Sequence, residues 1–489
     1  MQEKKTIITG AYKIFIPLFF LGLFALGNHH FSEDWLSYYS LSVIREPGYA
    51  LLVRGLVGGF GESMGIHLIA LVQNLLGAIS VFLFADHFEK NISKGFGNVA
   101  ALLLLLPHIA TPLASNTHLV LTDTVMAEGV CLSLFYLYMI PLTSIVFYEP
   151  LQALQPASDA ASAERPASSG EISVPQSGLP GSAWFKNLCA AYLLGILMCQ
   201  FRGQMMVTFI LTMLTVGAKL FLTSTVSHVS LLPYALAILL MIASFGINSV
   251  IGGTYQLIVN GIYTGKTLGP ANMACNVLYL SEKSAGEALS DPKERALFER
   301  MYEKALEERL LDDFAEEGLI ARERCYSDCH DRINYEIFEP CVQAYLEEQG
   351  VDVGNYALYR VEADKEASRL VKALLPACFK AWLRNYAAVC AVGFIRTVAV
   401  VHPLLNWYTI LVYGLAVLLA LWRFPKERNA ALYMGVVLVS IVGTVCSTAL
   451  IIECWARYVF YNMPFFYLAL YLLIRPYVCE LLSRGRASE

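Results

Sequence analysis

The amino-acid sequence predicts an all-α polytopic membrane protein with about ten transmembrane helices (10–11) and a mainly helical extracytoplasmic domain inserted late in the chain. The 489 residues are 56% hydrophobic, and the mean hydropathy is +0.53. Only 15% of the residues are charged, whereas soluble domains usually carry about 25%. The apolar residues are gathered in long blocks, and roughly 20 apolar residues suffice for a helix to cross a bilayer.

The first apolar block, Ala11–Gly27, follows Lys4 and Lys5 and is not followed by a small-residue cleavage site. We therefore expect a retained span and not a cleaved signal peptide. Nine further blocks have the composition of a span, and a long polar stretch separates the first six of these from the last three. They are Met64–Ala85, Gly97–Thr117, Thr122–Phe147, Trp184–Phe201, Gln204–Leu222, Leu231–Ile251, Pro403–Trp422, Ala430–Ile452 and Arg457–Ile474.

These blocks divide the chain into six parts. Residues 149–182 are rich in Pro, Ala and Ser and show no apolar period, which is typical of a disordered linker. The parts are 1–148 (transmembrane helices with an acidic first outer loop), 149–182 (cytoplasmic linker), 183–252 (transmembrane helices), 253–380 (extracytoplasmic helical domain), 381–402 (interfacial helix) and 403–489 (transmembrane helices and a cytoplasmic tail).

Lysine and arginine near the span ends predict the orientation, because cytoplasmic loops carry an excess of both. With the N-terminus inside, the inner loops hold Lys90, Lys94, Lys186 and the cluster Arg423–Arg428. This orientation requires that Trp382–Val400 does not cross the membrane, and its two arginines favour a helix that lies in the interface. If the segment crossed, the cluster would be outside. We expect a multi-pass protein of the plasma membrane with cytoplasmic N- and C-termini.

The polar stretch 253–380 holds 23 Asp and Glu against 15 Lys and Arg. Within it, Asp291–Leu311 begins with an Asp-Pro pair that suits a helix cap followed by a first-turn proline. The segment places Leu297, Met301, Ala305 and Arg309 on one helical face, with charged residues around it. We therefore expect a solvated amphipathic helix in this domain.

Ionisable residues gather where the spans meet the outer face. In the first outer loop, Glu33 and Asp34 are adjacent, and such a pair can act as a base or bind a cation; acidic pairs are also common in solvated loops. Asp123 and Glu128 lie at the start of the fourth span. A carboxylate in a lipid-facing helix costs about 2.5–3.5 kcal/mol, so Glu128 should face a protein-lined interior. Asp123 can also serve as a helix N-cap.

Two arginines lie at the same predicted face. Arg202 separates two short spans and can either snorkel to the interface or bind a phosphate, which suits a guanidinium. Arg457 opens the last span, four residues after Glu453, and an ion pair between these two is the plain structural alternative to phosphate binding.

Cysteine and histidine are clustered at Cys325, Cys329 and His330, with Cys341 nearby. The spacing is within the range of zinc ligands, but no second Cys/His pair follows it. A disulfide is the expected use of cysteines in an oxidising compartment, although their pairing does not follow from the sequence. We expect no zinc site here.

These features follow one another in an order that resembles a known family. After the acidic loop come Arg45-Glu-Pro-Gly-Tyr49-Ala-Leu-Leu, then Gly-Phe-Gly61-Glu-Ser63, a span with Gln73, the segment Leu121-Thr-Asp123, and finally Arg457-Tyr458 with Pro464. The set resembles the membrane glycosyltransferases of the C-type superfamily, and more narrowly the bacterial relatives of protein mannosyltransferases and of the aminoarabinose transferase. Two features depart from the family: Tyr49 is followed by Ala50 where the family has proline, and the acidic domain has no counterpart.

The resemblance implies transfer of a sugar from a polyprenyl-phosphate donor to a lipid, glycan or protein acceptor on the extracytoplasmic face. It implies that Asp34, with Glu33 second and Asp123 in support, acts as the catalytic base or positions the acceptor. Arg202 or Arg457 would hold the lipid phosphate, with Glu128, Arg45 and Tyr49 as further substrate-binding candidates. No cofactor is certain, and a divalent cation is an open possibility.

Two other function classes remain open at the level of sequence. A flippase or transporter of lipid-linked saccharides is one, although no internal repeat is visible and the ionisable groups lie near one face and not at the midplane. A polymerase, ligase or partner protein of surface-polysaccharide assembly is the other. The net charge of -5 gives no basic field for nucleic acid, so nucleic-acid binding is excluded.

Overall fold

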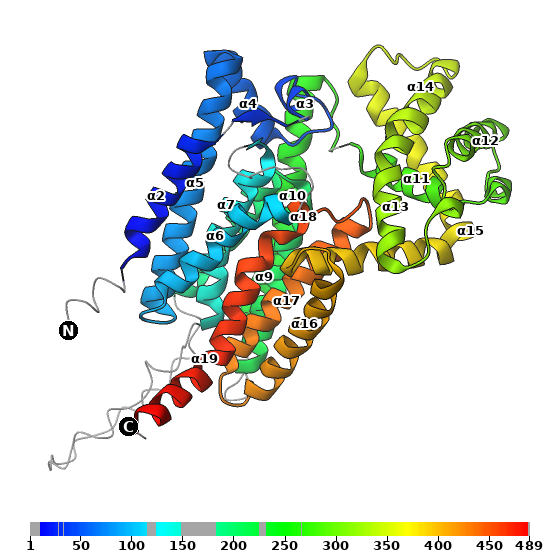
Figure 1. Cartoon of the computed structure of the whole chain (residues 1–489). Helices are drawn as coiled ribbons and strands as arrows, with labels where there is room; N and C mark the ends of the chain where they lie inside the picture. The colour runs from blue at the N-terminus through cyan, green and yellow to red at the C-terminus, as the bar shows by residue number, and fades with distance from the viewer. Residues whose placement is uncertain are drawn as a thin grey trace, which may run out of the picture.

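A helix of the structure overlaps each of the ten apolar blocks, although the last helix begins only at Met463 and continues past the predicted end (Figure 1). The structure is a computed structural model, and it describes residues 10–27, 29–32, 34–114, 124–147, 182–223, 231–265 and 267–487. The predicted linker 149–182 lies almost entirely outside the described residues. The ten helices are α2 (Tyr12–Leu26), α5 (Glu62–Asn91), α6 (Gly97–Ala114), α7 (Ala127–Phe147), α8 (Ser182–Cys199), α9 (Val207–Thr223), α10 (Leu232–Asn260), α16 (Pro403–Arg423), α17 (Arg428–Ala449) and α19 (Met463–Ala487).

Six helical segments of the described chain are long and apolar enough to cross a membrane: α5, α7, Gly203–Leu222, α10, α16 and α17. Three shorter apolar helices, Tyr12–Leu26, Gly97–Ile109 and Ala183–Cys199, accompany them. The outer faces of α10 and α16 expose large apolar side chains, among them Leu239 and Leu418. Such faces are stable only against lipid or protein, so the prediction of a helical membrane protein is confirmed at this level.

The first loop folds back over one end of the bundle. It contains the short helix α3 (Trp35–Tyr39) and the helix α4 (Pro47–Phe60), whose first residue is the proline that suits a helix start. Strand β1 (His30–Phe31) pairs in parallel with β2 (Thr124–Val125), so that His30 lies opposite Thr124. This pairing holds the first loop beside the segment that leads into α7.

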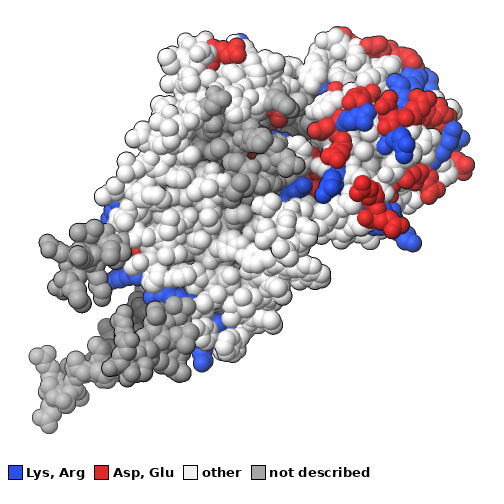
Figure 2. Space-filling model, viewed as in Figure 1, with Lys and Arg blue, Asp and Glu red and all other residues white. Residues whose placement is uncertain are grey.

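The polar stretch forms a separate helical domain at the same end of the bundle, on the right in Figure 1. Figure 2 shows that most of the visible charged side chains lie on this domain, whereas the bundle surface is largely uncharged. Its elements are α11 (Gly269–Leu280), η4 (Lys283–Ala288), α12 (Pro292–Glu307), η5 (Asp312–Phe314), α13 (Leu319–Arg332), η6 (Ile333–Phe338), α14 (Glu339–Glu348) and the first half of α15 (Tyr356–Val398).

The amphipathic helix predicted within Asp291–Leu311 is α12. The Asp291 carboxylate accepts a hydrogen bond from the Lys293 backbone N–H at 2.8 Å, and Pro292 is the first helical residue. Leu297, Met301 and Ala305 are buried as predicted, and Phe298 and Tyr302 widen that face. Arg309 does not belong to the face, because the helix ends at Glu307 and Arg309 has a φ of 57°.

The predicted boundaries of the polar domain differ from the structure at both sides. Helix α10 continues past residue 252 to Asn260 and stops at Gly261, whose φ of 73° suits glycine. At the other side no helix ends at 380: α15 runs unbroken for 43 residues from the domain into the bundle, where it packs against α17. The sequence of α15 changes from polar to apolar along its length. This change moves the helix from the polar domain into the bundle, but it does not interrupt the helical backbone. In Figure 1, α15 runs across the bundle axis.

Candidate functional site

The domain-facing end of the bundle collects most of the sequence-predicted site residues. Asp34 and Arg45 come from the first loop, Glu128 from the first turn of α7, Arg202 from the turn after α8, and Arg457 from α18 (Ala456–Val459). Glu33 and Asp123 lie outside the described residues.

Asp34 forms an ion pair with Arg45. The Asp34 Oδ1 lies 2.5 Å from Arg45 Nη2, and the Arg45 Nε donates to the Ser37 hydroxyl at 2.7 Å. The guanidinium also stacks on the ring of Tyr38, 4.4 Å from its centroid. The Asp34 side chain is 50% exposed, whereas the Arg45 side chain is 13% exposed. A mostly buried arginine, fixed by Ser37 and Tyr38, thus orients a carboxylate that is open to solvent.

Tyr49 lies behind this ion pair and is fully buried. Its hydroxyl donates to Gln73 Oε1 at 2.9 Å, and its ring packs edge-on against Tyr38. Tyr49 therefore supports the ring under Arg45 and does not itself line an accessible surface. The sequence shows the motif around Tyr49. The supporting position of Tyr49 depends on its contact with Gln73 of α5, and this contact could not be predicted from the sequence.

Glu46 and Gly48 connect the first loop to the Arg202 turn, and neither was predicted as functional. Glu46 is buried, and its Oε1 accepts a hydrogen bond from the Gly203 backbone N–H at 2.7 Å. The Gly48 N–H donates to the Gln200 carbonyl, also at 2.7 Å. A Cβ at position 48 would lie 2.7 Å from the same oxygen, so only glycine fits. The Glu-Pro-Gly part of the motif is the sequence signal for this connection.

Glu128 faces two arginines. Its Oε1 lies 3.3 Å from Arg202 Nη1 and 3.8 Å from Arg457 Nε. Glu128 is only 4% exposed, as its depth in the fourth span predicted. Arg202 turns inward to this carboxylate and does not snorkel. Arg457 pairs with Glu128, and no ion pair joins it to Glu453, so the structural alternative of an i,i+4 pair is not formed.

Aromatic rings hold both guanidinium groups in place. Arg202 lies over the Tyr458 ring at 4.8 Å, and Arg457 lies over the Trp455 ring at 4.5 Å. Arg457 also donates to the Tyr458 hydroxyl at 3.0 Å. Among the described residues, no acceptor lies within hydrogen-bond distance of the buried Arg457 Nε. Two guanidinium groups thus converge on the Glu128 carboxylate, and a second buried carboxylate, Glu46, lies at the Arg202 turn.

A groove of about 780 Å³ opens beside the Asp34–Arg45 pair, between α3, the end of α10 and the domain residues 354–357. Ser37, which contacts Arg45, belongs to its wall. The rest of the wall is mostly hydroxyl, amide and aromatic, with Tyr39, Ser40, Asn260, Asn355 and Tyr356 among its residues. Groups of this kind bind sugars, because hydroxyls and amides accept and donate hydrogen bonds while rings cover the apolar sugar face.

Among the cysteines whose side chains the structure describes, the expected disulfide does not form. Each described cysteine is unpaired, and Cys325 and Cys329 lie one turn apart on the same helix, α13. His330 turns away from them toward Asp331 and toward Glu453, which lies in the loop between α17 and α18. Burial raises the pKa of Glu453, although His330 acts in the opposite direction. Burial disfavours charged His330, but Asp331 and Glu453 outweigh it and raise the pKa of the imidazole.

Comparison with known proteins does not add to this picture. No family model matches the chain, and no match was found among curated proteins or solved structures. The site must therefore be interpreted from its own chemistry. It offers an accessible carboxylate held by arginine, a pair of buried arginines with an unused donor, and a polar and aromatic groove, all at one end of an apolar bundle.

Proposed function

We propose that this protein is a membrane glycosyltransferase that moves a sugar from a polyprenyl-phosphate donor to an acceptor on the extracytoplasmic face. The observation that carries the proposal is the position of the arginine pair. Arg202 and Arg457 converge on Glu128 at the end of an apolar bundle, where a lipid phosphate and its sugar can arrive together. Tyr38 links this pair to Asp34, since Tyr38 packs under the Arg45 that holds Asp34 and lies in the field of Glu128 and Arg202. Guanidinium groups are well suited to bind phosphate oxygens.

The reaction assigns a separate task to each group. Asp34 accepts the proton of the acceptor hydroxyl as its oxygen bonds to the anomeric carbon of the sugar. The bond between that carbon and the phosphate oxygen breaks, and the phosphate leaves with the electron pair. Arg202 and Arg457 stabilise the charge that develops on this phosphate. The groove beside Asp34 receives the acceptor or the transferred sugar.

The proposed topology has ten membrane crossings, cytoplasmic N- and C-termini, and the polar domain outside the cell membrane. The start of α2 and the end of α19 lie at the same end of the bundle, opposite the domain (Figure 1). That end also holds the α5–α6 turn, with Lys90 and Lys94, and the α16–α17 turn, with Lys426. The excess of basic residues there supports a cytoplasmic assignment. The second half of α15 then lies along the outer interface.

The test is sugar release and transfer from a panel of polyprenyl-phosphate sugars by the full-length protein in nanodiscs. We expect slow release by the wild type, and a loss of about 10²–10⁴-fold in Asp34→Asn, as is usual when a general base is removed. Glu62→Gln is the matched control, because Glu62 is an exposed acid at the same end of the bundle, and it should retain full activity.

The two alternative functions give different results in the same assay. Tight donor binding without release by the wild type, together with donor movement between leaflets, would indicate a flippase. No binding of any donor would indicate a scaffold or a partner protein of a surface-polysaccharide polymerase. Equal turnover by the wild type and Asp34→Asn would contradict the assigned base.

A further inference from the structure

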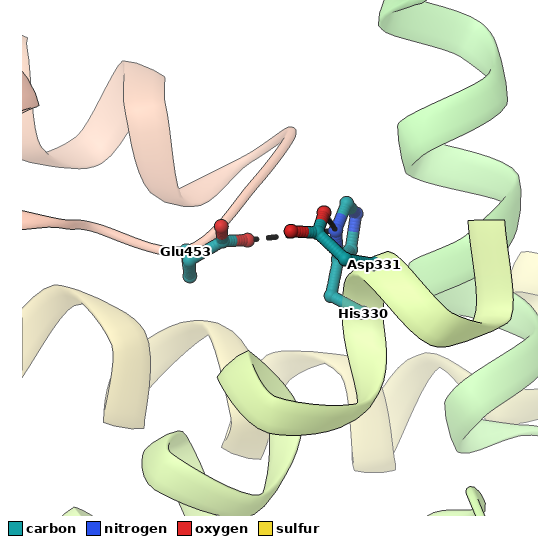
Figure 3. A group of neighbouring side chains, drawn as sticks. All are labelled: His330, Asp331 and Glu453. Atoms are coloured by element: carbon teal, nitrogen blue, oxygen red, sulfur yellow. Dashed lines mark hydrogen bonds and ion pairs between the residues drawn. The ribbon is translucent and has the colours of Figure 1, made fainter. Parts of the chain in front are cut away.

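A group of three side chains lies at the junction between the polar domain and the bundle (Figure 3). His330 and Asp331 are consecutive residues at the end of α13, and Glu453 comes from the loop between α17 and α18. Their ligand atoms all lie within 4.8 Å of one another. His330 and Glu453 are almost fully buried, whereas the Asp331 side chain is 58% exposed. In Figure 3, the Glu453 carboxylate points from its loop toward His330 and Asp331, which lie together on α13.

The contacts within this group are long: one weak hydrogen bond between His330 and Asp331, and one ion pair between His330 and Glu453. The His330 Nδ1 lies 3.4 Å from Asp331 Oδ1 and 3.6 Å from Glu453 Oε2. Both distances are longer than the roughly 2.7–3.2 Å that separates nitrogen and oxygen in a usual N–H···O hydrogen bond. The Glu453 Oε2 atom is buried and has no hydrogen-bond donor among the described residues. The ion pair with His330 at 3.6 Å leaves this buried oxygen without a hydrogen bond, which is costly, and a cation between these groups would satisfy it.

The spacing fits a small tetrahedral ion. With metal–ligand bonds of about 2.0–2.2 Å, two ligand atoms around such an ion are about 3.4 Å apart. Two of the three separations in this group are already close to that value. The third can shorten by rotation of Asp331, which is half-exposed and free to adjust. One imidazole and two carboxylates suit Zn²⁺ best, and Mn²⁺ next.

We propose that His330, Asp331 and Glu453 bind a divalent transition-metal ion, zinc in the first place, that joins the polar domain to the membrane bundle. The three residues leave a fourth coordination position for water or a substrate oxygen. Asp331 opens to solvent and gives the ion a way in. The ion crosslinks α13 to the loop that continues, four residues after Glu453, to Arg457. The site is distinct from any cysteine-based zinc site, and it does not depend on the proposed sugar transfer.

The test uses the full-length protein in detergent, stripped with a chelator and dialysed against Zn²⁺. Metal content by mass spectrometry should be about one zinc per wild-type chain and well below that in Glu453→Gln and His330→Asn. Replacement by Co²⁺ should give the intense visible absorption of a tetrahedral site. Asp331→Asn, at an exposed position that leaves folding intact, should weaken zinc affinity at least about tenfold, because one of three protein ligands is lost.

Asp328→Asn is the matched control, since Asp328 is an exposed acid on the same helix and is not a member of the group. It should bind zinc as the wild type does. Equal zinc content and affinity in the wild type, Asp331→Asn and Glu453→Gln would overturn the proposal and leave a buried histidine–carboxylate pair. Retained cobalt without a tetrahedral spectrum would also contradict it.

Discussion

The two ends of the helical bundle hold their cationic side chains in different ways. At the domain end, Arg45 and Arg202 are paired with the carboxylates of Asp34 and Glu128. At the opposite end, Lys219 donates to the Val146 carbonyl and to Asn429, and Arg475 donates to the Ser93 hydroxyl. The ion pair of Lys90 with Asp86 at this end is exposed on its lysine side. The first arrangement balances charge inside the protein. The second leaves net positive charge at the surface, which is how cytoplasmic membrane faces are marked.

This difference shows that the number of basic residues at one end of the bundle does not reveal whether they bind a ligand or position the helices in the membrane. A paired arginine in a protected site can exchange part of its carboxylate contact for a phosphate oxygen, because the positive charge is already in place and oriented. A cation against neutral oxygens at a helix end mainly positions the helix in the membrane.

The largest expected difference between the ends is their accessibility from outside the cell. A membrane-impermeant maleimide should label Glu316→Cys, an exposed position of the domain, above the wild-type background on intact cells. It should not label Lys426→Cys in the α16–α17 turn until the membrane is permeabilised. Labelling of Lys426→Cys alone on intact cells would reverse the orientation.

Loss of the buried carboxylate should be the next largest effect. Glu128→Gln removes the buried carboxylate that Arg202 and Arg457 both contact, and breaking a buried pair in this way typically costs about 3–5 kcal/mol. Asp86→Asn removes the partner of Lys90, whose side chain is 65% exposed, and should cost at most about 1 kcal/mol. Denaturant unfolding in detergent gives both values, and similar losses would refute the contrast between the ends.

The contact between the first loop and the Arg202 turn should be sensitive to one methyl group. Gly48→Ala places a Cβ 2.7 Å from the Gln200 carbonyl oxygen, and relieving such overpacking usually costs about 1–3 kcal/mol. Gly58→Ala in the same helix meets no atom within 4 Å and should stabilise it by up to about 1 kcal/mol. Thermal unfolding of the two variants tests this, and a neutral Gly48→Ala would mean that the loop is not held there.

A smaller effect is expected where the domain touches the aromatic residues around Arg457. The Trp455 Nε1–H donates to the Ser327 hydroxyl at 3.0 Å. Ser327→Ala should reduce stability by about 0.5–1.5 kcal/mol, the usual net value of one hydrogen bond. Ser284→Ala, an exposed serine of the same domain, should leave stability unchanged. A shift in Trp455 fluorescence specific to Ser327→Ala would locate the change at this contact.

The helices and the burial of Glu128 were predictable because they depend on local properties. Long apolar blocks must form helices in lipid, and a carboxylate in the first turns of such a block must avoid lipid. The cap at Asp291 is equally local, since it requires only the residues that follow it.

The partners of Glu453 and Arg457 were not predictable in this way. An i,i+4 pair presumes a helix through both residues, but α17 ends at Ala449 and α18 begins at Ala456, so Glu453 lies in a loop. The Glu453 side chain points toward His330 of the polar domain, and the two residues are far apart in the sequence. The positions of Glu46 and of the groove likewise depend on the packing of the first loop against α8 and α10.

The most direct test of the account is to locate the phosphate of the donor. A polyprenyl phosphate with a photoreactive group next to its phosphate should be crosslinked to the full-length protein in nanodiscs, and the labelled peptides identified by mass spectrometry. The account predicts label on the Arg202 turn and on residues 455–458, reduced at least about tenfold in Arg457→Gln and unchanged in Arg423→Gln. Label at the Lys219 and Arg423 end, or spread evenly over the lipid-facing helices, would contradict it.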